Sequence, residues 1–348
     1  MSKTNRNLFV TVAVLFLLSA LTYRQSVGRA DRFQRGQMFL SNLNPDEVAT
    51  IKVTKGEDGV TLRRQGERFT IVEKQDYPAS NSSVNRLLRD VLDIGLERQV
   101  GRGDGLAEEL EIEPPGDDTL ELALISGADK EMVRVRIGKT FEDGPGNYVQ
   151  RLDEEGAPIY LTSSGVHLTS DVDSFLEKQI LDHDRTEVDR IDGADFVVIR
   201  APEGGKLTLE EVPSDRQVDS SAVDKLGSVL KSLRFDNVFV ADDPEVADLQ
   251  FDQTLEFRLA DGSGYVLSLT NRDDRNFLKI RGTSQVQQVA ITVDESEEEL
   301  EEKAAMLTRA DEIDAFNGFH GSWVYEISDW NAEKLELRLA DLLESKES

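Results

Sequence analysis

Apolar residues recur along the chain in a pattern that occurs twice. Residues 82–97 (SSVNRLLRDVLDIGLE) and 221–236 (SAVDKLGSVLKSLRFD) both place apolar residues three and four positions apart, which is the spacing of one helical face. The matched apolar positions, each 139 residues apart, are Val84 and Val223, Leu87 and Leu226, Val91 and Leu230, and Ile94 and Leu233. The sequence therefore predicts two helices of one type, with Ser82 and Ser221 as their N-caps. Gly227 stands where the first copy has Leu88, which predicts closer packing of the second helix.

Both helices are surrounded by segments in which apolar and polar residues alternate, as in half-buried strands. The closest match is between residues 119–127 (TLELALISG) and 254–262 (TLEFRLADG). The other matched strand segments are 46–53 and 186–193, 59–64 and 195–200, 68–73 and 206–211, 132–138 and 265–270, 147–151 and 276–282, and 158–163 and 289–293. Acidic amphipathic helices at 170–181 and 296–307 are expected to close the two units.

These elements predict an α+β protein with two tandem similar domains, each a mainly antiparallel sheet with helices on one face, because most connections are short. After the second unit, a strand with Trp323 and Tyr325 and a helix over residues 335–343 are expected. The predicted organisation is an anchor and basic juxtamembrane segment at 1–40, a first repeat at 41–182, a second repeat at 183–310, and a C-terminal strand and helix at 311–348.

Residues 8–23 (LFVTVAVLFLLSALTY) carry no charged side chain. A helix of 16 residues extends about 24 Å, which approaches the ~30 Å hydrocarbon core of a bilayer. A secretory signal peptide is the alternative, but no small-x-small cleavage site stands out. We therefore expect an uncleaved transmembrane anchor and place the following domains outside the cytoplasm. The larger number of arginines after the stretch points to the opposite orientation under the positive-inside rule.

The composition excludes several classes of protein. The formal net charge is −28, from 68 acidic and 40 basic residues, which argues against a nucleic-acid partner because phosphate binding needs clustered Lys and Arg. The chain contains no Cys, so disulfides, thiolate nucleophiles and Cys-ligated metals are excluded.

Three short stretches invite a chemical interpretation. The glycines of 101–105 (GRGDG) lack the order of a dinucleotide-binding loop, and 138–140 (GKT) lacks the first glycine of a P-loop. We interpret both as ordinary loop or hairpin sequence. The best candidate for a metal or acid–base cluster is Asp182, His183 and Asp184, with Asp189 and Asp192 nearby. This cluster lies at the predicted junction of the repeats, where polar residues are expected, so we assign no catalytic, cofactor-binding or metal-ligating residue and expect no cofactor.

Several segments together resemble a known family. They are 43–53 (LNPDEVATIKV), 77–80 (YPAS), 84–94 (VNRLLRDVLDI), Trp323, Tyr325 and 335–343 (LELRLADLL). This combination, behind a short N-terminal anchor, resembles the domain of unknown function 4340 family, whose members are often encoded beside a gliding-motility-type ABC transporter permease and its auxiliary membrane protein. The usual Trp of the early strand is Phe69 here and Leu207 in the second copy. The family has no known catalytic residues to carry over.

We therefore expect a non-enzymatic accessory or binding protein of an ABC transporter system, with the permease and auxiliary protein as partners and a single-pass anchor in a bacterial inner membrane. An envelope protein that self-associates is the alternative. A metal-dependent hydrolase that uses His183 is a third interpretation.

Overall fold

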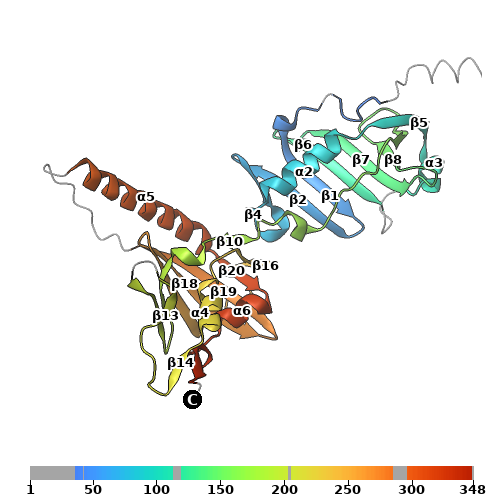
Figure 1. Cartoon of the computed structure of the whole chain (residues 1–348). Coiled ribbons are helices and arrows are strands. Elements are labelled where there is room, and N and C mark those ends of the chain that lie inside the picture. The colour runs from blue at the N-terminus through green and yellow to red at the C-terminus, as the bar shows by residue number, and fades with distance from the viewer. Residues whose placement is uncertain (1–35, 42, 113–118, 203–204, 285–295, 347–348) are drawn as a thin grey trace, which may run out of the picture. The chain divides into compact units, whose positions relative to one another are not determined.

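The computed structural model describes residues 36–41, 43–112, 119–202, 205–284 and 296–346. The expected anchor at 8–23 lies outside these residues. Among the helices that are described, none is both long and apolar enough to cross a bilayer. The chain divides between Glu177 and Lys178 into two compact units, and the sequence placed this boundary at 182/183. Figure 1 shows strands and helices in each unit, and all strand pairs are antiparallel, so the α+β class with mainly antiparallel sheets is confirmed.

The first unit is built on a nine-stranded sheet with the order β4-β3-β2-β1-β6-β7-β8-β9-β5. Its strands are β1 (Val48–Lys55), β2 (Asp58–Gln65), β3 (Arg68–Ile71), β4 (Tyr77–Pro78), β5 (Leu96–Arg102), β6 (Leu120–Ser126), β7 (Glu131–Thr140), β8 (Asn147–Arg151) and β9 (Pro158–Thr162). Its helices are α2 (Asn81–Leu92), α3 (Asp104–Glu109) and the 3-10 turns η1 (Pro45–Glu47), η2 (Val72–Lys74) and η3 (Val172–Phe175).

Helix α2 lies across one face of this sheet (Figure 1) and buries the predicted stripe, including Val84, Leu87 and Val91. Its N-cap is Ser80 rather than Ser82. The amide of Ser80 is bonded to the carbonyl of Phe175 at 2.7 Å, which keeps the chain extended up to that residue. The helix therefore starts earlier than predicted, and it ends at Leu92, before β5 begins at Leu96.

The second unit has an eight-stranded sheet with the order β13-β12-β11-β17-β18-β19-β20-β16, and the pairs β10-β15 and β14-β21. The strands are β10 (Gln179–Leu181), β11 (Val188–Asp192), β12 (Val197–Arg200), β13 (Leu207–Leu209), β14 (Arg216–Val218), β15 (Leu233–Arg234), β16 (Asn237–Val240), β17 (Gln253–Leu259), β18 (Ser263–Arg272), β19 (Arg275–Ser284), β20 (Trp323–Ile327) and β21 (Leu343–Ser345). The helices are α4 (Ser220–Gly227), α5 (Glu297–His320), α6 (Asp329–Leu335), and the 3-10 turns η4 (Arg185–Glu187) and η6 (Leu339–Leu342).

Helix α4 is capped by Asp219, not Ser221, because the Asp219 carboxylate accepts the amide of Ser221 at 2.9 Å and that of Ala222 at 3.1 Å. The helix stops at Gly227, earlier than predicted. A β-carbon on Gly227 would lie 2.5 Å from Leu207 Cδ1, so the prediction of close packing at this glycine is confirmed.

Two predicted helices are wrong. Residues 170–181 form the turn η3 and the strand β10, because β10 pairs with β15 of the second unit. Residues 335–343 are not one helix either: α6 ends at Leu335, and the chain continues through η6 into β21, which pairs with β14. The predicted helix at 296–307 is present as part of the longer α5, but it does not close the unit, because β20 follows it and belongs to the same sheet.

The two large sheets have the same strand order once the additional edge strand β4 is left out. In this comparison β1 corresponds to β11, β6 to β17, β7 to β18, β8 to β19, and β9 to β20. In the first unit, residues 152–157 connect β8 to β9. In the second unit, the connection from β19 to β20 contains α5. In the second sheet, β20 therefore holds the place that β9 holds in the first. The sequence instead predicted that residues 289–293 would be the counterpart of 158–163. Residues 289–293 lie outside the described residues.

Candidate functional site

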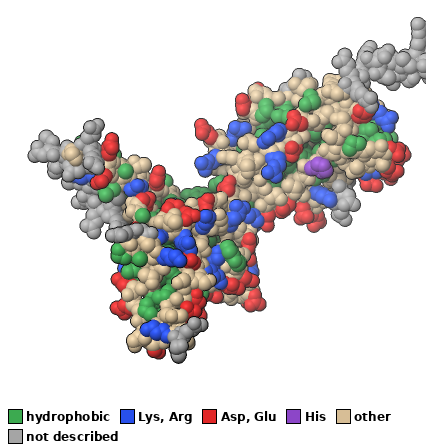
Figure 2. Space-filling model, viewed as in Figure 1, with side chains coloured by type: hydrophobic (Ala, Val, Ile, Leu, Met, Phe, Trp, Pro, Cys, Tyr) green, Lys and Arg blue, Asp and Glu red, His purple; other side chains and the backbone are tan. Residues whose placement is uncertain are grey.

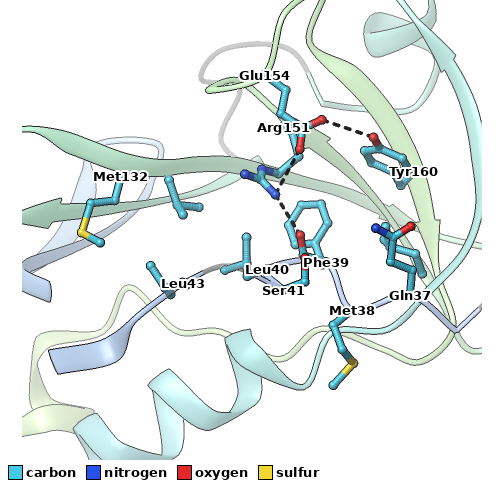
Figure 3. Close-up of a pocket in the computed structure, with 12 residues that line it drawn as sticks. Gln37, Met38, Phe39, Leu40, Ser41, Leu43, Met132, Arg151, Glu154 and Tyr160 are labelled. Atoms are coloured by element: carbon cyan, nitrogen blue, oxygen red, sulfur yellow. Dashed lines mark hydrogen bonds and ion pairs between the residues drawn. The ribbon is translucent and has the colours of Figure 1, made fainter. Parts of the chain in front are cut away.

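The first unit contains a pocket of about 320 Å³ between its sheet and the segment that precedes β1 (Figure 3). Strands β5, β7, β8 and β9 and the segment before β1 contribute its walls. Its lining residues are Gln37, Met38, Phe39, Leu40, Ser41, Leu43, Leu96, Met132, Val133, Arg151, Glu154 and Tyr160. The volume is at the small end of the ~300–1,000 Å³ range of ligand pockets, which suits one or two side chains rather than a large cofactor.

One wall of the pocket is an irregular segment, residues 36–41 and 43, which we call the strap. It runs beside the start of β5 through a hydrogen bond from the Gly36 amide to the Leu96 carbonyl at 2.9 Å and one from the Phe39 amide to the Ile94 carbonyl at 2.8 Å. Phe39 and Leu40 are buried. Their burial removes apolar surface from water and fixes the strap on the sheet.

Arg151 on β8 holds the strap in place (Figure 3). Its guanidinium donates to the Phe39 carbonyl oxygen at 2.8 Å and lies 5.2 Å from the centre of the Phe39 ring. The same group pairs with Asp153 at 2.5 Å and Glu154 at 3.3 Å. Burial by itself would lower the pKa of Arg151, but the hydrogen bond with Asp153 and the charges of Asp153 and Glu154 outweigh it and raise that pKa.

The two acidic partners of Arg151, Asp153 and Glu154, accept further hydrogen bonds. Burial would raise the pKa of Asp153, but hydrogen bonds from Arg151 and from the Arg134 amide lower it. Tyr160 donates to Glu154 at 3.3 Å and meets the Phe39 ring edge-on at 6.2 Å. Burial and the Glu154 charge raise the pKa of Tyr160, so its hydroxyl stays protonated at neutral pH. The pocket thus combines apolar side chains from the strap and β7 with the polar groups of Arg151, Glu154 and Tyr160, which pair with one another, an arrangement suited to binding.

A second hollow, of about 260 Å³, lies in the second unit and is rich in carboxylates: Asp236, Asp274, Glu326 and Asp329 line it together with Arg275 and Asn276. Arg275 pairs with Glu326 at 2.6 Å and with Glu245, and Asn276 donates to Asp329 at 2.8 Å. The Arg275 guanidinium also lies over the rings of Phe239 and Phe277. This hollow is therefore the surface of an ion-pair network that joins β19 to β20.

Comparison with family models matches residues 69–254 to the Domain of unknown function (DUF4340). The chain belongs to this family. The chain matches none of the curated proteins and none of the solved structures with which it was compared. The DUF4340 match begins within β3 and ends within β17, so it includes the pocket floor on β7 and β8 but not the strap.

In this DUF4340 protein, the predicted cluster around His183 is dispersed into separate local contacts. His183 Nδ1 lies 3.0 Å from Glu187, and Nε2 lies 3.1 Å from the Tyr265 hydroxyl. Asp182 accepts the Ser232 amide at 3.1 Å. Asp184 caps η4 and pairs with Lys231, Asp189 pairs with Arg200, and Asp192 pairs with Arg190. Within the described residues, no group of three or more His, Asp or Glu side chains is arranged to hold a metal.

The other two histidines lie elsewhere. His320 is buried at the end of α5, where its Nδ1 lies 2.7 Å from the Tyr325 hydroxyl and its ring lies 4.0 Å from that of Phe316. Burial lowers the pKa of His320 to about 4. His167 lies between β9 and η3.

The glycine-containing stretches are structural in their local context. Arg102 ends β5, and Gly103, with φ of 100°, precedes α3. Residues 138–140 end β7, and a β-carbon on Gly138 would lie 2.4 Å from the Leu110 carbonyl oxygen. Sequence reasoning missed the strap, which was included in the basic segment 1–40. The signal was the apolar pair Phe39-Leu40 between the arginines and Asn44-Pro45.

Proposed function

We propose that this chain is a membrane-anchored accessory protein of an ABC transporter system that acts by binding rather than by catalysis. In this proposal, a helix within residues 1–40 spans a bacterial inner membrane, and two similar α+β domains follow outside the cytoplasm. The permease and its auxiliary membrane protein are the proposed partners. Membership of the DUF4340 family and the uncharged apolar stretch 8–23 support this proposal.

The observation that carries the proposal is the pocket walled by the strap. The strap begins 13 residues after Tyr23, the last residue of the apolar stretch. A chain of that length spans at most about 45 Å when fully extended. The pocket would therefore lie within reach of membrane-embedded partners, and its mixed apolar and polar lining suits a protein side chain.

The shared strand order of the two sheets supports the duplication of a whole domain. A duplicated domain offers two related surfaces, and insertion of α5 into only one copy makes those surfaces different. We propose that the two copies bind different parts of the transporter assembly.

The surface also suits a solvated domain, since Figure 2 shows acidic and basic side chains interspersed on the face in view.

Co-purification tests this function. Full-length protein with a C-terminal affinity tag is extracted from native membranes in mild detergent, and the permease is followed by immunoblot. The expected result is enrichment of the permease, absent for an unrelated single-pass protein of equal abundance. Repeated extraction without the permease would reject the proposal.

Self-association in the envelope is the second candidate, and one observation favours it. Helix α5 exposes Leu300, Met306 and Leu307, each at about two-fifths of the residue surface (40%, 43% and 42%). Apolar side chains gathered on an exposed helix often mark an interface. Light scattering of the full chain in detergent distinguishes the two, because a monomer excludes self-association.

A further inference from the structure

The floor of the first-unit pocket has a counterpart in the second sheet. In the first sheet, Ile51 on β1 pairs with Leu124 on β6, which pairs with Val133 on β7. In the second sheet, Ile191 on β11 pairs with Phe257 on β17, which pairs with Tyr265 on β18. One strand farther, Val135 pairs with Arg151 on β8, and Leu267 pairs with Ile280 on β19. Because the strand order is shared, Val133 and Arg151 occupy the places that Tyr265 and Ile280 occupy in the second unit.

In the second unit, helix α5 covers Tyr265 and Gly282, which is the partner of Tyr265 on β19. The Phe316 ring lies edge-on to Tyr265 at 5.2 Å. Ile313 lies over Gly282, where a β-carbon would be 3.0 Å from its Cδ1. The Asn317 side chain makes two hydrogen bonds with the backbone of Gly282, accepting its amide at 2.7 Å and donating to its carbonyl at 2.9 Å. The sheet at this position thus packs against a helix that presents bulky apolar residues three positions apart.

The first unit lacks this insertion, since only residues 152–157 connect β8 to β9. Among the described residues, the strap is the segment that covers the corresponding place, and it leaves the 320 Å³ pocket between itself and β7 and β8. Figure 3 shows Met132 and Arg151 on the sheet side and Leu40 and Leu43 on the strap side of this space.

We propose that this pocket receives an amphipathic helix of a partner protein, through bulky apolar side chains spaced as Ile313 and Phe316 are in α5. This inference rests on the proposed binding function and names the element that is bound. A second copy of this chain is disfavoured by two observations: the net charge of −28 makes two copies repel, and the Ile313 side of α5 is already buried on its own sheet. The partner helix is therefore expected to carry Lys or Arg on its polar face.

The test uses the full-length protein and a labelled peptide with the sequence of residues 304–321, in which Asp311, Glu312 and Asp314 are replaced by lysine. Fluorescence anisotropy measures its binding. We expect saturable binding that weakens by about tenfold or more when Met132→Glu introduces a charge at the pocket floor, or when Ser41→Trp fills the pocket from its exposed rim. The same peptide with alanine in place of Ile313 and Phe316 should lose affinity to a similar extent.

Met306→Glu is the matched control, because it makes the same substitution at an exposed methionine in the other unit. Its affinity for the peptide should equal that of the wild type. Failure of the peptide to bind the wild type, or equal binding to Met132→Glu and Ser41→Trp, overturns the inference. A wild-type dimer that Met132→Glu converts to a monomer assigns the pocket to a second copy and also overturns it. If the permease co-purifies equally with wild type and both pocket variants, the proposed function stands and this inference fails.

Discussion

Arg151 holds Phe39 in two ways, by a 2.8 Å hydrogen bond to its carbonyl oxygen and by stacking over its ring at 5.2 Å. These residues are far apart in the sequence, and their contact fixes the strap on the sheet. Replacing Arg151 by Met should therefore release the strap. Hydrogen bonds to charged groups contribute about 1.5–3 kcal/mol, so amide exchange at Phe39 should quicken by roughly tenfold to a hundredfold.

The control for this prediction is Arg134→Met. Arg134 pairs with Glu121 at 2.7 Å and is 42% exposed, so its removal should change stability by about 1 kcal/mol or less and leave the Phe39 amide unaffected. Mass-spectrometric hydrogen exchange of peptides covering residues 36–43 measures the amide exchange rate of the strap in both variants. Equal protection of the strap in Arg151→Met and wild type would contradict the assigned role of Arg151.

His320 makes stability depend on pH. Its pKa is lowered by burial from 6.5 to about 4 in the folded protein. Between these values the unfolded state binds more protons, so the free energy of unfolding falls as pH falls, by about 3 kcal/mol in total. His320→Gln removes the titrating group, so the variant lacks this loss of stability at low pH. The stability advantage of the wild type over the variant should therefore shrink by about that amount between pH 7 and pH 4. Urea unfolding across this range measures it, and a constant difference would show that His320 is not buried as a neutral ring.

Two glycines should respond in opposite directions. Gly227→Leu introduces the residue that the first copy has at this position, but its β-carbon would lie 2.5 Å from Leu207, so we expect a loss of about 1–3 kcal/mol. A β-carbon on Gly318 in α5 would have no neighbouring atom within 4 Å, so Gly318→Ala should stabilise the protein by about 0.5–1 kcal/mol. Thermal unfolding of the two variants compares them, and equal effects would refute the packing difference.

These positions show what the sequence could predict. The 139-residue offset identified helices α2 and α4, and Gly227 marked the closer packing, because both depend on local apolar spacing. The caps at Ser80 and Asp219 were missed because contacts with distant or neighbouring backbone decide where a helix starts. Residues 335–343 have a helical apolar pattern, but pairing of β21 with β14 overrides it. A long-range strand partner cannot be read from periodicity.

The pocket was not predictable for a related reason. Its residues come from the strap, β5, β7, β8 and β9, and no short motif contains them. The match of 158–163 with 289–293 concealed the insertion of α5, because similar strand patterns do not specify a place in a sheet. Only the pairing register shows that Val133 corresponds to Tyr265.

Metal removal should have no effect on the protein. Both ring nitrogens of His183 are engaged, by Glu187 at 3.0 Å and by Tyr265 at 3.1 Å. EDTA treatment should therefore leave the unfolding temperature unchanged, while His183→Ala should cost about 1–2 kcal/mol through loss of these bonds. Bound metal in elemental analysis that disappears in His183→Ala would revive the hydrolase interpretation.

Topology can be measured on an otherwise Cys-free chain. Cysteine introduced at the exposed positions Asp143 and Asp215, one in each unit, should react with a membrane-impermeant maleimide in intact spheroplasts. Lysis should not increase the labelling further. Labelling only after lysis would place the domains in the cytoplasm, as the arginine distribution around residues 8–23 suggests.

Photocrosslinking from the pocket rim in living membranes tests the central claim most directly. A photoreactive amino acid at Ser41, which lines the pocket and is exposed, reports what lies against it, and the same residue at Asp215 serves as the control. The account predicts an adduct between position 41 and the permease or its auxiliary membrane protein, lost when Met132→Glu is added. An adduct with only a second copy of this chain, or no adduct at position 41, would contradict it.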